Sequence, residues 1–285
     1  MQNAILNERR LTEAQAGWAA PNPPSPGGQI WAPPSAPGAA TAPITDGPVS
    51  TWRGAMTVRG TLTATSLLFV ILLVAAYFGW QATPEPTIDP ATNTIQYGFP
   101  GIALVGVAIG FVAVMALIFR PHLAKYIAPV YAVGQGFAVG AISAYYNQLF
   151  NGIVVQAVGA TLGVFAVMLL LYRTRIIRVT ERFRRVIVLA TLGVMAFYLV
   201  SFIVNLVGPE VTFLREPNAI GILFSVGVSI LAALNLTLDF DFIERGTKAG
   251  LAKDFEWYAA FGLMVTIVWL YLELLRLLAL LQGRR

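Results

Sequence analysis

Residues 258–281 read YAAFGLMVTIVWLYLELLRLLALL, an apolar run in which only Glu273 and Arg276 are charged. About 20 apolar residues in a helix are enough to cross the roughly 30 Å hydrocarbon core of a bilayer. Inside lipid, every backbone amide has to be hydrogen-bonded within the segment, so a run of this kind is expected to be helical. This stretch therefore predicts a transmembrane helix.

Six runs of similar length and character precede it. They are Thr61–Trp80, Gly101–Phe119, Tyr126–Tyr145, Gly152–Tyr172, Val186–Val207 and Ala219–Leu238. The whole composition agrees, since 57% of the residues are hydrophobic and only 12% are charged, against about 25% charged in ordinary soluble domains. The sequence thus predicts an all-α membrane protein whose residues 51–285 form a seven-transmembrane helix bundle.

Residues 1–50 differ from the rest of the chain. Nine of the 17 prolines lie between Pro21 and Pro48, mixed with Gly, Ala and Ser. No apolar periodicity runs through this segment, and no apolar stretch follows its first charged residues as a signal peptide would require. We therefore expect a disordered, Pro-rich cytoplasmic tail, either simply solvated or docking a partner protein.

Basic side chains are concentrated before the first run and after the second, fourth and sixth runs. The connection over residues 173–185 alone holds six arginines, whereas residues 146–151 carry no charge. The positive-inside rule then predicts a cytoplasmic N-terminus, and seven spans place the C-terminus outside. A seventh segment that re-enters the membrane is the alternative, favoured by Arg284 and Arg285. These connections also account for the net charge of +5, so we expect no nucleic-acid partner.

Several kinds of chemistry are excluded by the residues that are missing. The chain has no Cys and a single His, His122, which excludes disulfide scaffolds, thiolate metal sites, thiol nucleophiles and most zinc enzymes. Ser143 lies near the end of a run, but no run supplies a His base, and no metalloprotease or aspartyl-protease string occurs. We therefore expect neither an enzyme nor a cofactor.

Small residues suggest where helices touch, because packing between helices in lipid depends on close approach of their backbones. Glycine pairs four residues apart occur in three consecutive runs. They are Gly106 and Gly110, Gly136 and Gly140, and Gly159 and Gly163. These stripes favour a compact monomeric bundle, with dimerisation through one stripe as the alternative.

Polar residues in the last two runs lie on single helical faces. The seventh run carries Gly262, Thr266, Trp269, Glu273 and Arg276, spaced by four, three, four and three. A face with an acid and a base should turn to the bundle interior or to a water-filled cavity. The alternative is a structural ion pair between Glu273 and Arg276.

The sixth run ends in a similar but weaker polar line. It consists of Ser225, Ser229, Ala232, Asn235 and Asp239. Asp241 points about 200° away from Asp239 on a helix, so it should meet headgroups or the basic connection. The alternative for Asp239 is that it only marks the end of the helix.

Three stretches resemble the transmembrane BAX inhibitor motif family, of the bacterial YccA-like kind. They are residues 128–143 (APVYAVGQGFAVGAIS), residues 238–241 (LDFD) and residues 259–278, which contain Leu-Leu-Arg. The resemblance implies six helices wrapped around a central seventh, in a bacterial plasma (inner) membrane. It also implies a pH-dependent calcium leak, or the modulation of a membrane-bound AAA protease.

The family's pH sensor is described as two aspartates that share a proton, on helices six and seven. Asp239 matches the first, but Thr266 stands at the position of the second, and Glu273 lies two turns, about 10 Å, further along the same face. Gln135 stands where the family's third helix usually has an acid; the simpler interpretation is a hydrogen bond across helices. Either the sensor is rebuilt from Asp239 and Glu273, or the switch is weakened or absent.

Two functions follow from these residues. The first is a pH-sensitive calcium or cation channel, or a proton-coupled exchanger, in which Asp239, Asn235, Thr266 and Glu273 offer the oxygen ligands that hard cations prefer. Asp239 and Glu273 would coordinate calcium transiently. The alternative is a non-transporting regulator whose tail and basic loops bind a partner such as a membrane protease.

Overall fold

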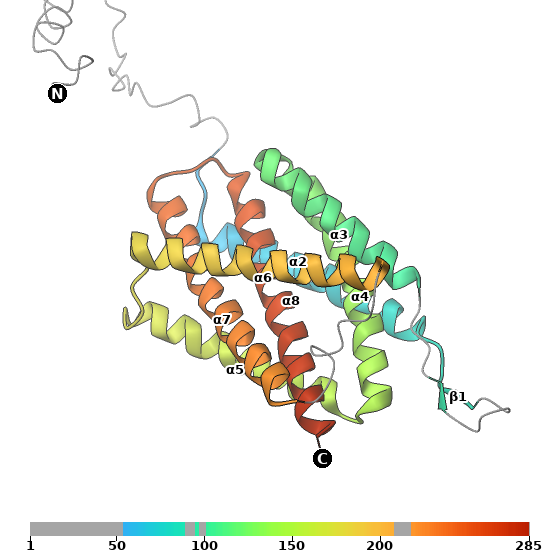
Figure 1. Cartoon of the computed structure of the whole chain (residues 1–285). Helices are drawn as coiled ribbons and strands as arrows, with labels where there is room; N and C mark the ends of the chain where they lie inside the picture. Colours follow the sequence, from blue (N-terminus) through green and yellow to red (C-terminus); the bar gives the residue numbers. More distant parts are fainter. Residues whose placement is uncertain (1–53, 89–94, 97–100, 208–217, 285) are drawn as a thin grey trace, which may run out of the picture. The chain divides into compact units, whose positions relative to one another are not determined.

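The computed structural model describes residues 54–88, 95–96, 101–207 and 218–284, so the predicted tail over residues 1–50 lies outside the described residues. The described part forms seven α-helices, which belong to one compact unit over residues 47–285 (Figure 1). They are α2 (Val58–Gln81), α3 (Ile102–Phe119), α4 (Ala124–Leu149), α5 (Ile153–Arg173), α6 (Glu181–Val207), α7 (Ala219–Lys248) and α8 (Phe255–Gln282). A 3-10 turn, η2 (Pro121–Leu123), precedes α4, and two short strands, β1 (Thr87–Ile88) and β2 (Ile95–Gln96), pair antiparallel. Each predicted run corresponds to one helix, although the ends of some helices differ.

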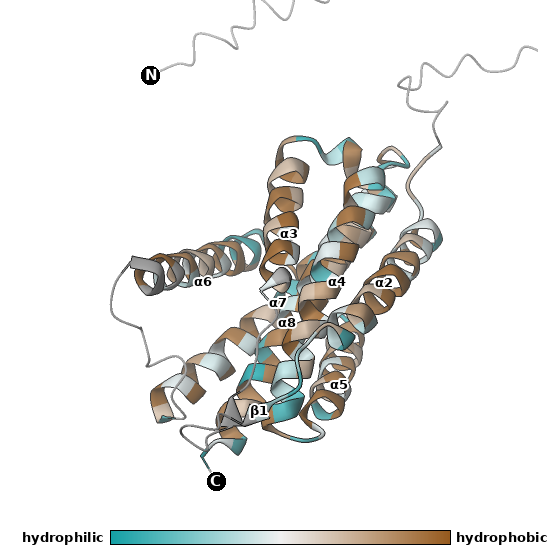
Figure 2. Cartoon of the chain, turned by 90° about the vertical axis from the view of Figure 1, so that its right-hand side faces the viewer, coloured by the Kyte–Doolittle hydropathy of each residue, from teal (hydrophilic) through white to brown (hydrophobic). Residues whose placement is uncertain are grey.

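The outer faces of these helices are apolar. Large hydrophobic side chains such as Leu73, Leu162 and Leu223 are 62–73% exposed, and Figure 2 shows hydrophobic residues over much of the helices. Six of the described helices are long and apolar enough to cross a membrane, and α3 is a shorter apolar helix. Because a soluble protein rarely exposes so much apolar surface, the predicted all-α, multi-pass membrane protein is confirmed.

Helix α8 is the central element of the bundle. It packs against α2, α4, α5 and α7, and in Figure 1 it runs between α7 and α4. Its side chains Met264, Leu270 and Leu275 are fully buried. Helix α3 packs on α4 and helix α6 on α7, so these two occupy the outermost positions around the central seventh helix.

Glycines allow α4 to approach two neighbours closely. A Cβ atom at Gly136 or Gly140 would collide with carbonyl oxygens of α2, and a Cβ atom at Gly106 of α3 would collide with the backbone of α4. A Cβ atom at Gly159 or Gly163 would meet no atom of the described residues within 4 Å. The prediction of close packing therefore holds for the first two glycine pairs but not for the third, because α5 turns that stripe away from the bundle.

The beginning of α2 is fastened to the beginning of α8. Residues 54–57 run antiparallel to the turn 251–253 and form two backbone hydrogen bonds of 2.7 and 3.1 Å with it. The Glu256 carboxylate accepts hydrogen bonds from the Thr57 amide at 2.9 Å and from the Thr57 hydroxyl at 2.8 Å. Thr57 in turn caps α2 by accepting from the amide of Gly60. A buried acid at a helix N-terminus also complements the helix dipole.

We predict that Glu256→Ala lowers the free energy of unfolding by about 2 kcal/mol, because two hydrogen bonds to a charged group are lost at a helix N-terminus. Titration of the purified protein with a denaturing detergent measures this change. Glu181→Ala is the control, since that side chain is 78% exposed and its ion pairs should contribute little. Equal losses in the two variants would contradict the prediction.

Candidate functional site

Buried or half-buried polar groups lie on the two neighbouring helices α7 and α8. On α7 they are Ser225, Ser229 and Asp239, and on α8 they are Thr266 and Glu273; we call these five residues the polar seam. The two serines, Thr266 and Glu273 are each no more than 8% exposed. Polar groups inside lipid are expensive unless they are paired, so their placement between two helices indicates a function or a tightly bonded network. The structure has polar atoms without a partner at one position along the seam and a bonded network at another.

Asp239 is the acid of the seam that has one oxygen without a hydrogen bond. Its Oδ2 atom is buried and has no hydrogen-bond partner among the described residues, as is also true of the Ser229 hydroxyl. Asp239 faces α8 close to Gly262, with its Oδ1 atom only 3.5 Å from the place of a Cβ atom there. A buried polar atom without a partner lowers the stability of the fold. Asp239 is therefore a candidate for a functional rather than a structural role.

Thr266 lies beside the Asp239 carboxyl group and interacts with it. Its hydroxyl donates to the backbone carbonyl of Gly262 at 3.1 Å. A hydroxyl has a single proton to donate, so Thr266 can support either its own helix or an ionised Asp239, but not both fully. An ionised Asp239 would therefore compete with the Gly262 carbonyl for the Thr266 hydroxyl proton.

Glu273 is surrounded by donors from three helices. The Ser225 hydroxyl donates to it at 2.7 Å, the Tyr198 hydroxyl at 2.9 Å and the Arg276 guanidinium at 3.4 Å. Arg276 also donates to the Tyr198 oxygen at 2.8 Å, and its guanidinium carbon lies 5.8 Å from the centroids of the Tyr198 and Phe224 rings. We call Tyr198, Ser225, Glu273 and Arg276 the Glu273 network. It contains the ion pair that the spacing suggested.

The structure does not bring Asp239 and Glu273 together. Asp239 neighbours Gly262 and Thr266, whereas Glu273 is bonded to Ser225, and two turns of α8 separate Thr266 from Glu273. A carboxyl pair rebuilt from these two acids is therefore not formed in this arrangement. Within the described residues, no group of three or more His, Asp or Glu side chains could hold a metal ion. Transient passage of a cation needs weaker coordination than that.

Asn235 and Asp241, the other predicted pathway residues of α7, contact α6. The Asn235 amide donates to the Thr191 hydroxyl at 2.9 Å. Asp241 pairs with Arg245 and, at 3.1 Å, with Arg184, so it meets basic residues as its spacing from Asp239 predicted. Together with Tyr198 and Glu273, these contacts attach α6 at three levels along its length.

The predicted residues of α4 have packing roles. The Gln135 side-chain oxygen lies against Gly110, since a Cβ atom there would be 2.8 Å from it, so it faces α3. Gly136 and Gly140 contact α2. Sequence reasoning missed Tyr198 and Glu256. The position of Glu256 in the first turn of a helix was a usable signal, whereas nothing distinguished Tyr198 from other aromatic residues in its run.

Comparison with known proteins agrees with this architecture. A family model described as Bax inhibitor 1 like matches residues 3–283, nearly the entire chain, as the sequence resemblance predicted. Searches of curated proteins and of solved structures find no match.

Proposed function

Because the chain belongs to the Bax inhibitor 1 like family, we propose that it is a pH-sensitive leak channel for cations, with calcium as the ion to test first. The observation that carries the proposal is the Asp239 carboxyl group. It lies between α7 and the central helix α8, with one oxygen buried and without a hydrogen-bond partner among the described residues. The Glu273 network stands apart from it and is assigned a structural role.

The mechanism follows from the cost of charge between two helices. A protonated Asp239 is neutral and fits between α7 and α8 with Thr266 as its neighbour. An ionised Asp239 is poorly supported there, so ionisation favours an arrangement of the two helices that admits water or a cation. Flux is therefore expected to rise as pH rises. Because one proton is linked to the change, the response is at most about tenfold per pH unit.

Calcium flux into proteoliposomes at pH 6, 7 and 8 tests the proposal. Wild type is expected to conduct more at pH 8 than at pH 6. Asp239→Asn should conduct at one low level at every pH, because its amide stays neutral. Glu273→Gln should keep the pH response of wild type. A pH response that survives in Asp239→Asn would overturn the assignment of Asp239 as the sensor.

The same assay separates two other functions. Proton-coupled exchange through Asp239 would appear as calcium movement against its gradient when a proton gradient is imposed. A wild-type protein that passes no calcium at any pH would place the regulator function first, with the partner protein bound through the tail and the exposed basic connection after α5.

We also propose a bacterial plasma membrane as the location, with the N-terminus in the cytoplasm and the C-terminus outside. The support is the arginine-rich connection after α5 and the positive-inside rule. The chain has no cysteine, so single cysteines at Lys253 and Gln282 can be labelled with a membrane-impermeant thiol reagent on intact spheroplasts. Labelling at residue 282 alone is expected. Labelling at residue 253 alone would reverse the orientation, and labelling of neither or both residues would indicate a re-entrant last helix.

A further inference from the structure

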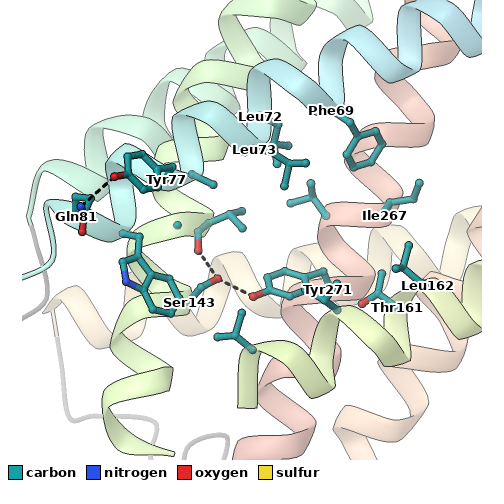
Figure 3. A pocket seen from close by; sticks show the side chains of 17 residues that line it. Phe69, Leu72, Leu73, Tyr77, Gln81, Ser143, Thr161, Leu162, Ile267 and Tyr271 are labelled. Atoms are coloured by element: carbon teal, nitrogen blue, oxygen red, sulfur yellow. Dashed lines mark hydrogen bonds between the residues drawn. The ribbon is translucent and has the colours of Figure 1, made fainter. Parts of the chain in front are cut away.

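A groove with a volume of about 650 Å³ lies between α2 and α5 (Figure 3). Phe69 and Leu73 of α2 line one wall, and Leu162 of α5 lines the other. Its floor is formed by α4 and α8 together with the buried Thr161 of α5. Val268 and Tyr271 of α8 are only 5% and 9% exposed there. The groove has the size of ligand sites in proteins, and it is separate from the polar seam, which lies between α7 and α8.

We propose that this groove binds an acyl chain of a bilayer phospholipid. Its walls continue directly into the lipid-facing surface, because Leu73, Tyr77 and Leu162 line the groove and are also 61–63% exposed. A hydrocarbon chain that enters from the bilayer therefore stays in apolar surroundings throughout. It would fill a space in which no water molecule could find enough hydrogen-bond partners.

The polar groups at the floor are already satisfied by the protein. The Ser143 and Tyr271 hydroxyls are hydrogen-bonded to each other at 2.6 Å, Ser143 also bonds to the carbonyl of Val139, and the Thr161 hydroxyl donates to the carbonyl of Ala157. Among the residues that the structure describes, no charged side chain lines the groove. These properties select an uncharged hydrocarbon over an ion or a charged metabolite.

One end of the groove is suited to a lipid headgroup. Tyr77, Trp80 and Gln81 lie there, at the C-terminal end of α2, and the Gln81 amide donates to the Tyr77 hydroxyl at 3.3 Å. Tyr and Trp are enriched where a membrane protein meets the headgroup region. We place the glycerol end of the lipid here, with its chain running toward Phe69.

A second copy of this chain fits the groove less well. A helix with its side chains is about 10–12 Å across, too wide to reach floor residues as buried as Val268 and Thr161, which are 5% and 4% exposed. A single methylene chain is narrow enough to do so. The depth of the floor therefore favours a lipid chain over a partner helix.

Photo-crosslinking tests the proposal. The full chain is reconstituted into vesicles of phosphatidylethanolamine and phosphatidylglycerol that contain a phospholipid with a diazirine in its acyl chain, and labelled residues are mapped by peptide mass spectrometry. In wild type, we expect labels on the buried floor residues Thr161 and Val268 as well as on outward residues such as Leu169. Ala76→Phe, which fills the groove from α2, should lose the floor labels and keep the label on Leu169.

Ala166→Phe is the matched control, because Ala166 is exposed on α5 and does not line the groove; it should label as wild type does. If Ala76→Phe does not fold, Val158→Phe fills the groove from the opposite wall. Floor labels that are absent in wild type, or that persist in a folded groove-filling variant, would overturn the proposal. Crosslinked dimers joined through Thr161 or Val268 would do so as well, by showing a second copy in the groove.

Discussion

Replacing Gly140 by Leu is expected to lower the free energy of unfolding by about 3 kcal/mol, the upper end of the cost of overpacking a core. The site has no room even for a Cβ atom, which would collide with the backbone carbonyl of Ala76 in α2. A backbone carbonyl cannot rotate away as a side chain can, so the two helices have to separate. Detergent-denaturant titration of the purified variant, compared with wild type, measures the loss.

Gly159→Leu is the control for this prediction. Gly159 also lies inside an apolar helix, but a Cβ atom there meets no atom within 4 Å in the described part of the chain. The change should be neutral, or should stabilise by up to about 1 kcal/mol because Leu is a better helix former than Gly. Similar losses of stability in both variants would show that the close approach of α2 and α4 is not the reason why a larger side chain at position 140 destabilises the protein.

Glu273→Ala is expected to destabilise the bundle by about 3 kcal/mol, as the loss of one member of a buried ion pair does. The carboxylate, 5% exposed, accepts hydrogen bonds from Ser225 and Tyr198 and pairs with Arg276. Its removal leaves the Arg276 charge inside the bundle and removes the hydrogen bond that holds the C-terminal half of α6 through Tyr198. The same titration measures the change.

The double variant Glu273→Leu, Arg276→Leu separates the two causes of this loss. If the cost of the single variant comes mainly from the guanidinium that stays behind, the double variant should recover most of the lost stability, since apolar replacements of buried ion pairs are often neutral. A double variant as unstable as Glu273→Ala would instead assign the loss to the bonds with Ser225 and Tyr198.

The seven helices were predictable because the length and apolar character of each run are dictated by the bilayer. Their ends were less so. Helix α7 continues to Lys248, ten residues beyond the predicted Leu238, and α6 begins at Glu181, five residues before Val186. An apolar run ends where charge begins, but backbone hydrogen bonds continue into the polar segments at the membrane surface.

Spacing along one helix also predicted part of the site. It placed Glu273 and Arg276 on one face, and it separated Asp239 from Asp241, which lies among arginines. Partners from other helices could not be predicted in this way. The hydrogen bond from Tyr198 to Glu273 joins residues 75 apart in the chain, and only the packing of α6 on α7 decides that pairing.

The contact between Thr57 and Glu256 has a consequence for how the protein is made. These residues are 199 positions apart, so the start of α2 leaves the ribosome long before the carboxylate that fastens it is synthesised. At about 5–20 residues per second, roughly 10–40 s separate the two events. During that time the Thr57 amide and hydroxyl must form hydrogen bonds with water, lipid headgroups or the insertion machinery instead. The contact between α2 and α8 forms only when translation has passed Glu256, so this part of the bundle closes with the synthesis of α8.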